Sequence, residues 1–241
     1  PQWQRGDETG LCDGVDNDCD GRTDEDFVDQ LFLADRQTRR PCFAGAGLCR
    51  TEGVVACNET GMTTSCTAVA REPVSDRDDT CDALDQDCDG ALDEDFLDAM
   101  VRVGDIYIYA FEASRPGATA ALGGLDANPE DEIENFIEAR ACSRPGVLPW
   151  DDVSWPEAED ACIAAGARLC TAAEFTLACG GALGEAYPYG GSYRSHLCNG
   201  QTYDIDPEQA GIQDGPLVCG AVASCVRDSV FDLSGNLKEW A

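Results

Sequence analysis

Residues 12–27 read CDGVDNDCDGRTDEDF, and residues 81–96 repeat them closely as CDALDQDCDGALDEDF. Each copy carries three aspartates at alternate positions and a glycine directly after the third. An oxygen-coordinating calcium loop needs this pattern, because every second side chain can turn inward and glycine allows the sharp bend that follows. The sequence therefore predicts one metal-binding loop in each copy.

The calcium-loop pattern assigns an oxygen ligand to each alternate position. We expect carboxylates from the alternating aspartates, a backbone carbonyl from the residue after the glycine, and closure by an acidic residue near the loop end. A complete EF-hand would close with a glutamate where Phe27 stands, and no long helix pattern flanks the loops, so an EF-hand pair is not expected. The predicted ligands are Asp16, Asp18, Asp20, Arg22, Asp24 and Glu25 in the first loop, with Asp26 as a further candidate for closure, and Asp85, Asp87, Asp89, Ala91, Asp93 and Glu94 in the second.

The chain is strongly acidic. Its 241 residues include 16 basic and 47 acidic side chains, for a formal net charge of −31. Such a charge repels nucleic acid phosphates and anionic lipids and favours divalent cations, so we expect calcium as the bound ion, no nucleic acid partner and no membrane insertion. A solvated, disordered acidic run is the alternative explanation. Cysteines and glycines at matched positions in both copies favour the calcium loop.

The 15 cysteines indicate disulfides. None of them forms a C-x-x-C pair, which argues against zinc-ribbon and thioredoxin-like sites. Disulfides persist in oxidising compartments, so we expect an extracellular or cell-surface protein. No apolar run approaches membrane-spanning length. Because Pro1 is not an initiator residue, we expect the natural start to lie upstream. Cys19 is expected to bond Cys12 and so to preorganise the first loop.

Between the two loops, disulfides are expected to replace a hydrophobic core. Residues 52–57 and 62–66 read as a short hairpin around an Asn-Glu-Thr-Gly turn. Phe27, Leu31 and Phe32 form an apolar foot on which the first module can pack. The pairing of the four cysteines in this segment, Cys42, Cys49, Cys57 and Cys66, stays open because spacing does not decide it.

After Val103 the acidic repeats end and a mixed apolar sequence begins. Residues 106–111, IYIYAF, predict a buried strand, and residues 128–141 predict a helix with an acidic first turn. Capping boxes at residues 154–157 and 171–174 predict two further helices, which end at Gly166 and at the glycine pair 180–181. We expect acidic loop modules at residues 1–30 and 76–100, a disulfide-stapled segment at 31–75, and a larger domain at 101–241.

The cysteine- and glycine-rich segment followed by CDGxDNDCDGxxDEDF resembles a metal-binding repeat of large secreted bacterial surface proteins. The resemblance covers about residues 7–98, and one relative is a copper-binding surface protein of a methane oxidiser. It implies an exported, metal-loaded stalk or adhesion module. Hard carboxylate ligands favour calcium over copper in this chain.

The segments PWDDVSWPEAEDAC, GARLCTAAEFTLACGG, YPYGGSY, CNG and FDLSGNLKEW resemble, in this order, the formylglycine-generating (sulfatase-modifying) enzyme family. The resemblance covers about residues 106–241 and implies an α+β C-type-lectin-like fold with a small antiparallel sheet. The fold class expected for the whole chain is therefore small disulfide-rich calcium-loop modules followed by this domain.

The same resemblance implies a structural calcium site in the last motif. Its ligands would be Asp232, the carbonyls of Gly235 and Leu237, and the Glu239 carboxylate. A glycine turn before a buried Trp240 is the alternative. A second, looser family site would involve Asn199, Gly200 and Asp214.

The family's oxidase chemistry uses a cysteine pair that binds copper(I) beyond the G-N-x-x-E-W motif, and this sequence ends at Ala241, so no residue takes that role by matching. Among the seven cysteines of this domain one is expected to stay unpaired, and the single histidine, His196, is expected in a surface loop. The prediction therefore leans away from an enzyme. It favours an extracellular calcium-binding structural, adhesion or assembly protein, whose partners are calcium and further copies of itself, surface proteins or glycans. The alternatives are a copper-dependent formylglycine-generating oxidase and a copper-binding surface protein.

Overall fold

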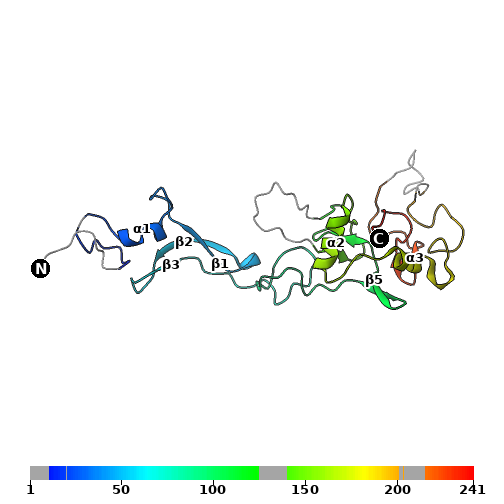
Figure 1. Cartoon of the computed structure of the whole chain (residues 1–241), viewed down its shortest axis with the longest axis horizontal. Coiled ribbons are helices and arrows are strands. Elements are labelled where there is room, and N and C mark those ends of the chain that lie inside the picture. The colour runs from blue at the N-terminus through cyan, green and yellow to red at the C-terminus, as the bar shows by residue number, and fades with distance from the viewer. Residues whose placement is uncertain (1–10, 20, 125–139, 201–202, 204–214) are drawn as a thin grey trace. The chain divides into compact units, whose positions relative to one another are not determined.

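A computed structural model describes residues 11–19, 21–124, 140–200, 203 and 215–241 (Figure 1). The predicted helix at 128–141, Asp20 and Asp214 lie in whole or in large part outside these residues. The chain divides into two compact units. The first comprises Pro1–Asp78 and Leu84–Glu94, and the second comprises Asp79–Ala83 and Asp95–Ala241.

A three-stranded antiparallel sheet forms the centre of the first unit, with strand order β1-β2-β3 (Figure 1). β1 (Pro41–Ala44) pairs with β2 (Thr51–Cys57), and the short 3₁₀ helix η2 (Gly47–Cys49) lies between them. β3 (Thr64–Cys66) pairs with the other edge of β2, which confirms the predicted hairpin. A disulfide between Cys42 and Cys66 joins the two outer strands. This disulfide helps to stabilise a sheet that buries few apolar side chains.

The apolar foot of the first loop lies in the 3₁₀ helix η1 (Glu25–Phe27) and the single-turn helix α1 (Val28–Leu31). Phe27 and Leu31 are buried together with Cys12, which confirms the predicted packing. The predicted Cys12–Cys19 bond is wrong, because Cys12 bonds Cys57. The Cys12 amide donates to the Gly61 carbonyl over 2.6 Å, and this holds the start of the loop against the β2–β3 hairpin.

The described residues of the second unit form three two-stranded antiparallel sheets and two α-helices. Its core gathers residues from a strand, a helix and the C-terminal region, namely Ile108, Ala178, Val230 and Leu233. The predicted strand forms, but Tyr107 is 65% exposed, so the strand alternates between core and solvent instead of being buried on both faces. The sheets are β4 (Met100–Val103) with β5 (Ile106–Tyr109), β6 (Ala113–Ser114) with β7 (Cys142–Ser143), and β8 (Val226–Arg227) with β9 (Val230–Phe231).

Both predicted capping boxes are present. The boxes begin α2 (Trp155–Ala164) and α3 (Ala172–Gly180), and in each the N-cap and N3 side chains bond reciprocally to backbone amides. A 3₁₀ turn, η3 (Gly181–Leu183), follows α3 directly. Gly166 and Gly181 have φ values of +71° and +61°, so glycine ends both helices as predicted.

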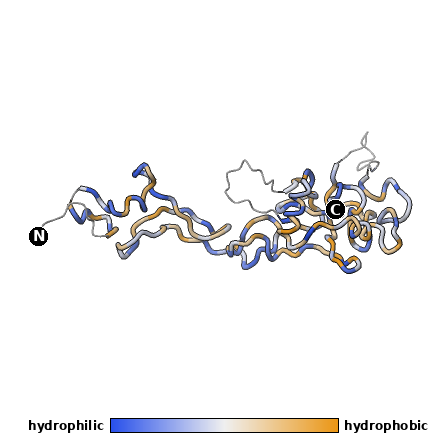
Figure 2. Tube along the Cα trace, in the orientation of Figure 1, coloured by the Kyte–Doolittle hydropathy of each residue, from blue (hydrophilic) through white to orange (hydrophobic). Residues whose placement is uncertain are grey.

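Figure 2 shows short apolar stretches interleaved with hydrophilic ones along the chain. Among the helices of the described residues, none is long and apolar enough to cross a lipid bilayer. The antiparallel sheets and the five disulfides agree with the disulfide-rich part of the predicted fold class. The C-type-lectin-like class stays a prediction.

Candidate metal centre

The second acidic loop brings carboxylates into two overlapping groups. Asp85, Asp87 and Asp89 form one group, and Asp87 also joins Asp78 and Glu94 in the other. Within each group the three ligand oxygens lie within 4.8 Å of one another. All five residues belong to the first unit. Such a cluster of carboxylate oxygens matches the donor chemistry that calcium prefers.

Two of these carboxylates are buried and only partly hydrogen-bonded. Asp78 is fully buried and Asp85 is 2% exposed. One Asp78 oxygen accepts from the amides of Gln86 and Asp87 over 2.7 and 3.1 Å, and one Asp85 oxygen accepts from the Gly90 amide over 3.0 Å. The other oxygen of each, Oδ2 of Asp78 and Oδ1 of Asp85, is buried without a hydrogen-bond partner. Burial of an unpaired anionic oxygen is costly, so a cation would fit these residues.

The electrostatics of the cluster follow from burial and from its own charge. Burial raises the pKa of Asp78, the two backbone hydrogen bonds oppose that rise, and Asp87 and Asp85 add to it. For Glu94 a hydrogen bond from its own amide lowers the pKa, but burial and the neighbouring carboxylates together raise it. A divalent cation at this position would offset the repulsion between carboxylates that contributes to both raised pKa values.

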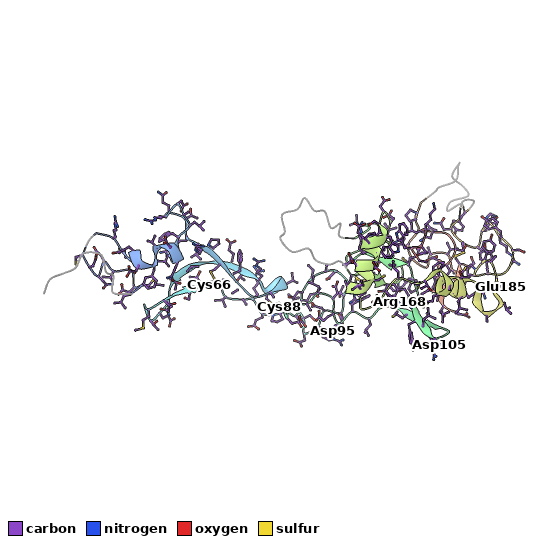
Figure 3. The ribbon with its side chains drawn as sticks, viewed as in Figure 1. Cys66, Cys88, Asp95, Asp105, Arg168 and Glu185 are labelled. Atoms are coloured by element: carbon purple, nitrogen blue, oxygen red, sulfur yellow. A yellow bond between two sulfur atoms is a disulfide. The ribbon has the colours of Figure 1, made fainter. Side chains whose placement is uncertain are left out.

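The hairpin that precedes the loop covers it. The Leu48 amide donates to the Asp85 carbonyl over 3.0 Å, and a disulfide joins Cys49 to Cys88, which is labelled in Figure 3. A Cβ at Gly47 would lie 2.3 Å from the Asp85 Cβ, so only glycine allows the turn to approach this closely. The burial of Asp85 is therefore a product of tertiary packing.

The described residues of the first acidic loop share three backbone features with the second. The Gly21 amide donates to Asp16 over 2.9 Å, as the Gly90 amide does to Asp85. Cys19 and Cys88 have φ values of +62° and +67°, in the left-handed region. Asp24 and Asp93 are a matched pair as well, at +54° and +53°. The two copies therefore share these turns, but residues 25–27 of the first copy form η1, whereas residues 94–96 of the second form no helix.

Asp24 folds the first loop through its carboxylate. It is buried and accepts from the Asp13 amide over 2.9 Å and from the Gly14 amide over 3.2 Å. It also lies close to the sulfurs of Cys12 and Cys57, but those sulfurs form a disulfide, so this group is not a metal site. Asp24 is thus placed to shape the loop, and its predicted ligand role stays a prediction.

The other predicted ligands are placed as follows. In the second loop the structure brings together Asp85, Asp87, Asp89 and Glu94. Asp93 is buried but belongs to neither of the two groups. Ala91 is exposed, and its amide donates to Asp89 over 2.8 Å. In the first loop Asp16, Asp18 and Glu25 are half-buried and Arg22 is exposed. Their ligand roles stay predictions.

Sequence reasoning missed Asp78. It precedes the repeated segment, and the position that corresponds to it in the first copy is Thr9, so an overlay of the two copies hides it. The acidic run around Asp78, residues 76–79, was the only signal, and it does not tell a ligand from a solvated charge.

The C-terminal motif forms a second polar centre, in the second unit. Asp232 is buried and accepts from the Gly220 amide over 2.6 Å. Glu112, which the sequence did not single out, accepts from the Leu237 amide over 3.1 Å and from the Asn236 side chain. Burial raises the pKa of Glu112 to about 8, against the Asn236 hydrogen bond and with help from Glu239 and Asp232. A cavity of about 140 Å³ is lined by the three carboxylates Glu112, Asp232 and Glu239, with aromatic and cysteine side chains around them.

Two glycine-asparagine motifs meet beside this centre. The Asn236 amide donates to the Asn199 carbonyl over 2.7 Å, and the Asn199 side chain donates to Asn236 Oδ1 over 2.8 Å. A Cβ at Gly235, where φ is +94°, would lie 2.4 Å from the Asn199 carbonyl oxygen. The expectation of a buried Trp240 is wrong: it is 46% exposed, and its ring N–H donates to the Val153 carbonyl. The calcium ligands expected at Asp232, Gly235, Leu237 and Glu239 stay predictions.

All 15 cysteines are placed. Ten form five disulfides, and five are free. The expectation of a single unpaired cysteine in the larger domain is wrong, because Cys142 bonds Cys81 and only Cys198–Cys225 is bonded within residues 101–241. His196 lies exposed in a turn, as predicted. The free cysteines are Cys19, Cys162, Cys170, Cys179 and Cys219.

Comparison with protein families finds matches to two families in different parts of the chain. Residues 126–241 match the family described as "Sulfatase-modifying factor enzyme 1-like domain". Residues 126–241, just under half of the chain, are therefore similar to this family. Residues 5–25 and 72–94 match a family described as "Putative metal-binding motif", whose name refers to copper binding and to MopE, and the second match includes Asp78. Both resemblances inferred from the sequence are thereby confirmed. No curated protein and no solved structure matches the chain.

Proposed function

We propose that the second acidic loop binds a hard divalent cation, calcium in the first place, and that the chain is an extracellular calcium-stabilised structural, adhesion or assembly protein. In this proposal the sulfatase-modifying factor enzyme 1-like domain serves for binding or scaffolding. Its partners would be further copies of the chain, other surface proteins or glycans. The five disulfides support an oxidising, extracellular setting.

One observation carries the proposal: buried carboxylate oxygens of Asp78 and Asp85 have no hydrogen-bond donor, inside a cluster of five acidic side chains. These residues would hold the ion with Asp87, Asp89 and Glu94. The bound ion would supply the positive charge that the buried oxygens lack. The protein's own part is to keep the carboxylates in place, through the Gln86, Asp87 and Gly90 amides and the Cys49–Cys88 bond.

Calcium would then act as a structural element of the first unit. An ion that binds the folded loop but not the unfolded chain stabilises folding by about 2.7 kcal/mol at a hundredfold excess over its Kd. Without it, repulsion within the cluster opposes the packed position of the loop under the hairpin turn. Calcium-dependent rigidity is the mechanism by which the module would support display or adhesion.

Calorimetric titration of the metal-free protein with calcium tests the proposal, together with melting before and after chelation. We expect saturable binding and a clear loss of melting temperature on chelation. Asp78→Asn and Asp85→Asn should each weaken binding by about tenfold or more, because each removes a ligand charge. Asp76→Asn is the matched control, since Asp76 is exposed and close by in sequence. Equal calcium affinity in all three variants would contradict the proposed site.

Copper is the second candidate, favoured by the name of the family that residues 5–25 and 72–94 match. Copper(I) prefers thiolates, and Cys162 and Cys170 line one cavity of the second unit. Burial raises the pKa of both thiols, which disfavours the thiolate. Titration with copper(I) separates the candidates: copper(I) binding without any calcium stabilisation would favour copper storage. Copper-dependent oxygen consumption with a cysteine-containing peptide would favour the oxidase.

A further inference from the structure

The two acidic loops differ in how their cysteines pair. The two cysteines of a loop also differ in whether their partner comes later or earlier in the chain. The first cysteine of each loop bonds a cysteine that comes later, in the pairs Cys12–Cys57 and Cys81–Cys142. The second cysteine of the second loop, Cys88, bonds Cys49, which comes earlier in the chain. Its counterpart in the first loop, Cys19, is free and exposed.

The backbone presents Cys19 and Cys88 in the same way. Both residues have left-handed φ values, and in both loops the glycine two positions later donates its amide to the first alternating aspartate. The missing bond at Cys19 therefore does not come from a different loop conformation. It comes from the absence, among the described residues, of a cysteine placed as Cys49 is placed in the second loop.

The two loops also differ in how much of the surface beside this cysteine is buried. In the second loop the turn at Gly47–Cys49 lies against Asp85, and the Val74 amide donates to the Gln86 carbonyl over 3.0 Å. Asp85 is buried as a result, while the equivalent Asp16 is only half-buried. The first loop thus exposes the face on which a hairpin turn is seated in the second.

We propose that Cys19 forms a disulfide with a cysteine of another hairpin segment of the residue 42–66 kind, and that the turn of this segment docks on the first acidic loop as Gly47–Cys49 docks on the second. The chain's own Cys49 is already bonded to Cys88, so the partner cysteine lies in another such hairpin. In forming the bond, Cys19 and its partner each lose a proton. The two electrons and two protons pass to an oxidant disulfide, which is reduced to two thiols. The acidic loop is then a covalent joint between successive hairpin modules.

Peptide mapping of the protein purified from its natural source tests this joint. Free thiols are alkylated before digestion, and the digest is analysed without reduction. We expect the Cys19 peptide in disulfide linkage with a glycine- and cysteine-rich peptide other than the one that contains Cys49. Recovery of alkylated Cys19, or of Cys19 bonded to Cys12, would overturn the proposal. A gel run with and without reductant tells the source of the partner, because a hairpin on another chain changes the mass and one on the same polypeptide does not.

A tandem protein provides a second test that does not depend on the natural source. A second copy of residues 31–80 is placed ahead of residue 12, so that the first loop follows a hairpin as the second loop does. We expect Cys19 to react with N-ethylmaleimide at least about tenfold more slowly than in the single chain, because a bonded sulfur is not a thiolate nucleophile. Cys→Ser at the Cys49 position of the added copy should restore the fast reaction. Equal reactivity of Cys19 in the single and tandem chains would overturn the proposal.

Discussion

The two acidic loops have nearly the same sequence and share backbone turns at their described residues, yet they differ in burial. In the second loop Asp85 is buried under a hairpin turn that the Cys49–Cys88 disulfide holds in place. In the first loop the equivalent Asp16 is half-buried and Cys19 is free. The comparison teaches that the repeat specifies the loop, whereas the segment docked on it decides how far its carboxylates are removed from water.

Loss of the Cys49–Cys88 disulfide should have the largest effect on folding stability and calcium affinity. The double variant Cys49→Ser/Cys88→Ser removes the bond that holds the turn on the second loop, and we expect it to lose about 2–4 kcal/mol of folding stability. Calcium affinity should fall as well, because Asp85 becomes more exposed. Thermal unfolding in the presence and absence of calcium measures both effects. Cys19→Ser is the matched control and should leave the melting temperature of this chain unchanged; a double variant that melts like its parent would contradict the comparison.

A smaller loss is expected when the turn can no longer approach the loop. Gly47→Ala places a methyl group 2.3 Å from the Asp85 Cβ, at a φ of +44°. Such overpacking should cost about 1–3 kcal/mol and weaken calcium binding. Gly14→Ala is the control, because no atom lies within 4 Å of its Cβ position and the second loop already carries Ala83 there, at a φ of +59°. The measurement is chemical denaturation with and without calcium, and equal losses in both variants would show that close packing at Gly47 has no special role.

Acid should separate the metal-free protein from the calcium-loaded one. Because burial raises the pKa of Asp78, this group stabilises the metal-free fold most at pH values below its unfolded pKa, and the contribution is lost as pH rises through the raised pKa. Calcium requires the ionised carboxylate, so protons compete with it. We therefore expect the increase in melting temperature caused by calcium to be larger at pH 7 than at pH 4. In Asp78→Asn this pH dependence should become weaker, and an unchanged pH dependence would exclude Asp78 from the site.

The smallest effect is expected in the second unit, far from the acidic loops in sequence, and it serves as a reference for the acid experiment. The ion pair with Arg168 and the Thr171 amide lower the pKa of Glu174 to about 2. Its contribution is therefore present above the unfolded pKa of about 4.5 and lost as pH falls through about 2. Glu174→Gln should lower the melting temperature slightly at pH 7 and leave the effect of calcium unchanged, as differential scanning calorimetry can measure. A change in the calcium effect would show that the acid response is not specific to the loops.

Local sequence signals determined the elements of this protein. The alternating aspartates and the glycine fixed the loop backbone twice, the capping boxes fixed the starts of α2 and α3, and glycines fixed their ends. The β2–β3 hairpin and the apolar foot at Phe27 and Leu31 were predicted for the same reason. In the loops, the helix caps and the hairpin the decisive interactions join residues close together in the chain, so the order of residues contains them. The foot was predicted only as an apolar segment, and its packing partners Cys12, Val55 and Cys57 lie further away along the chain.

Only the tertiary structure decided the cysteine pairing and the centre of the acidic cluster. The local expectation joined Cys12 to Cys19, but Cys12 lies against the β2–β3 hairpin and bonds Cys57. Asp78 was not singled out because it lies outside the repeat, although folding buries it beside Asp87 and Glu94. A disulfide partner and a buried charge depend on which segments meet in space, and spacing along the chain does not contain that information.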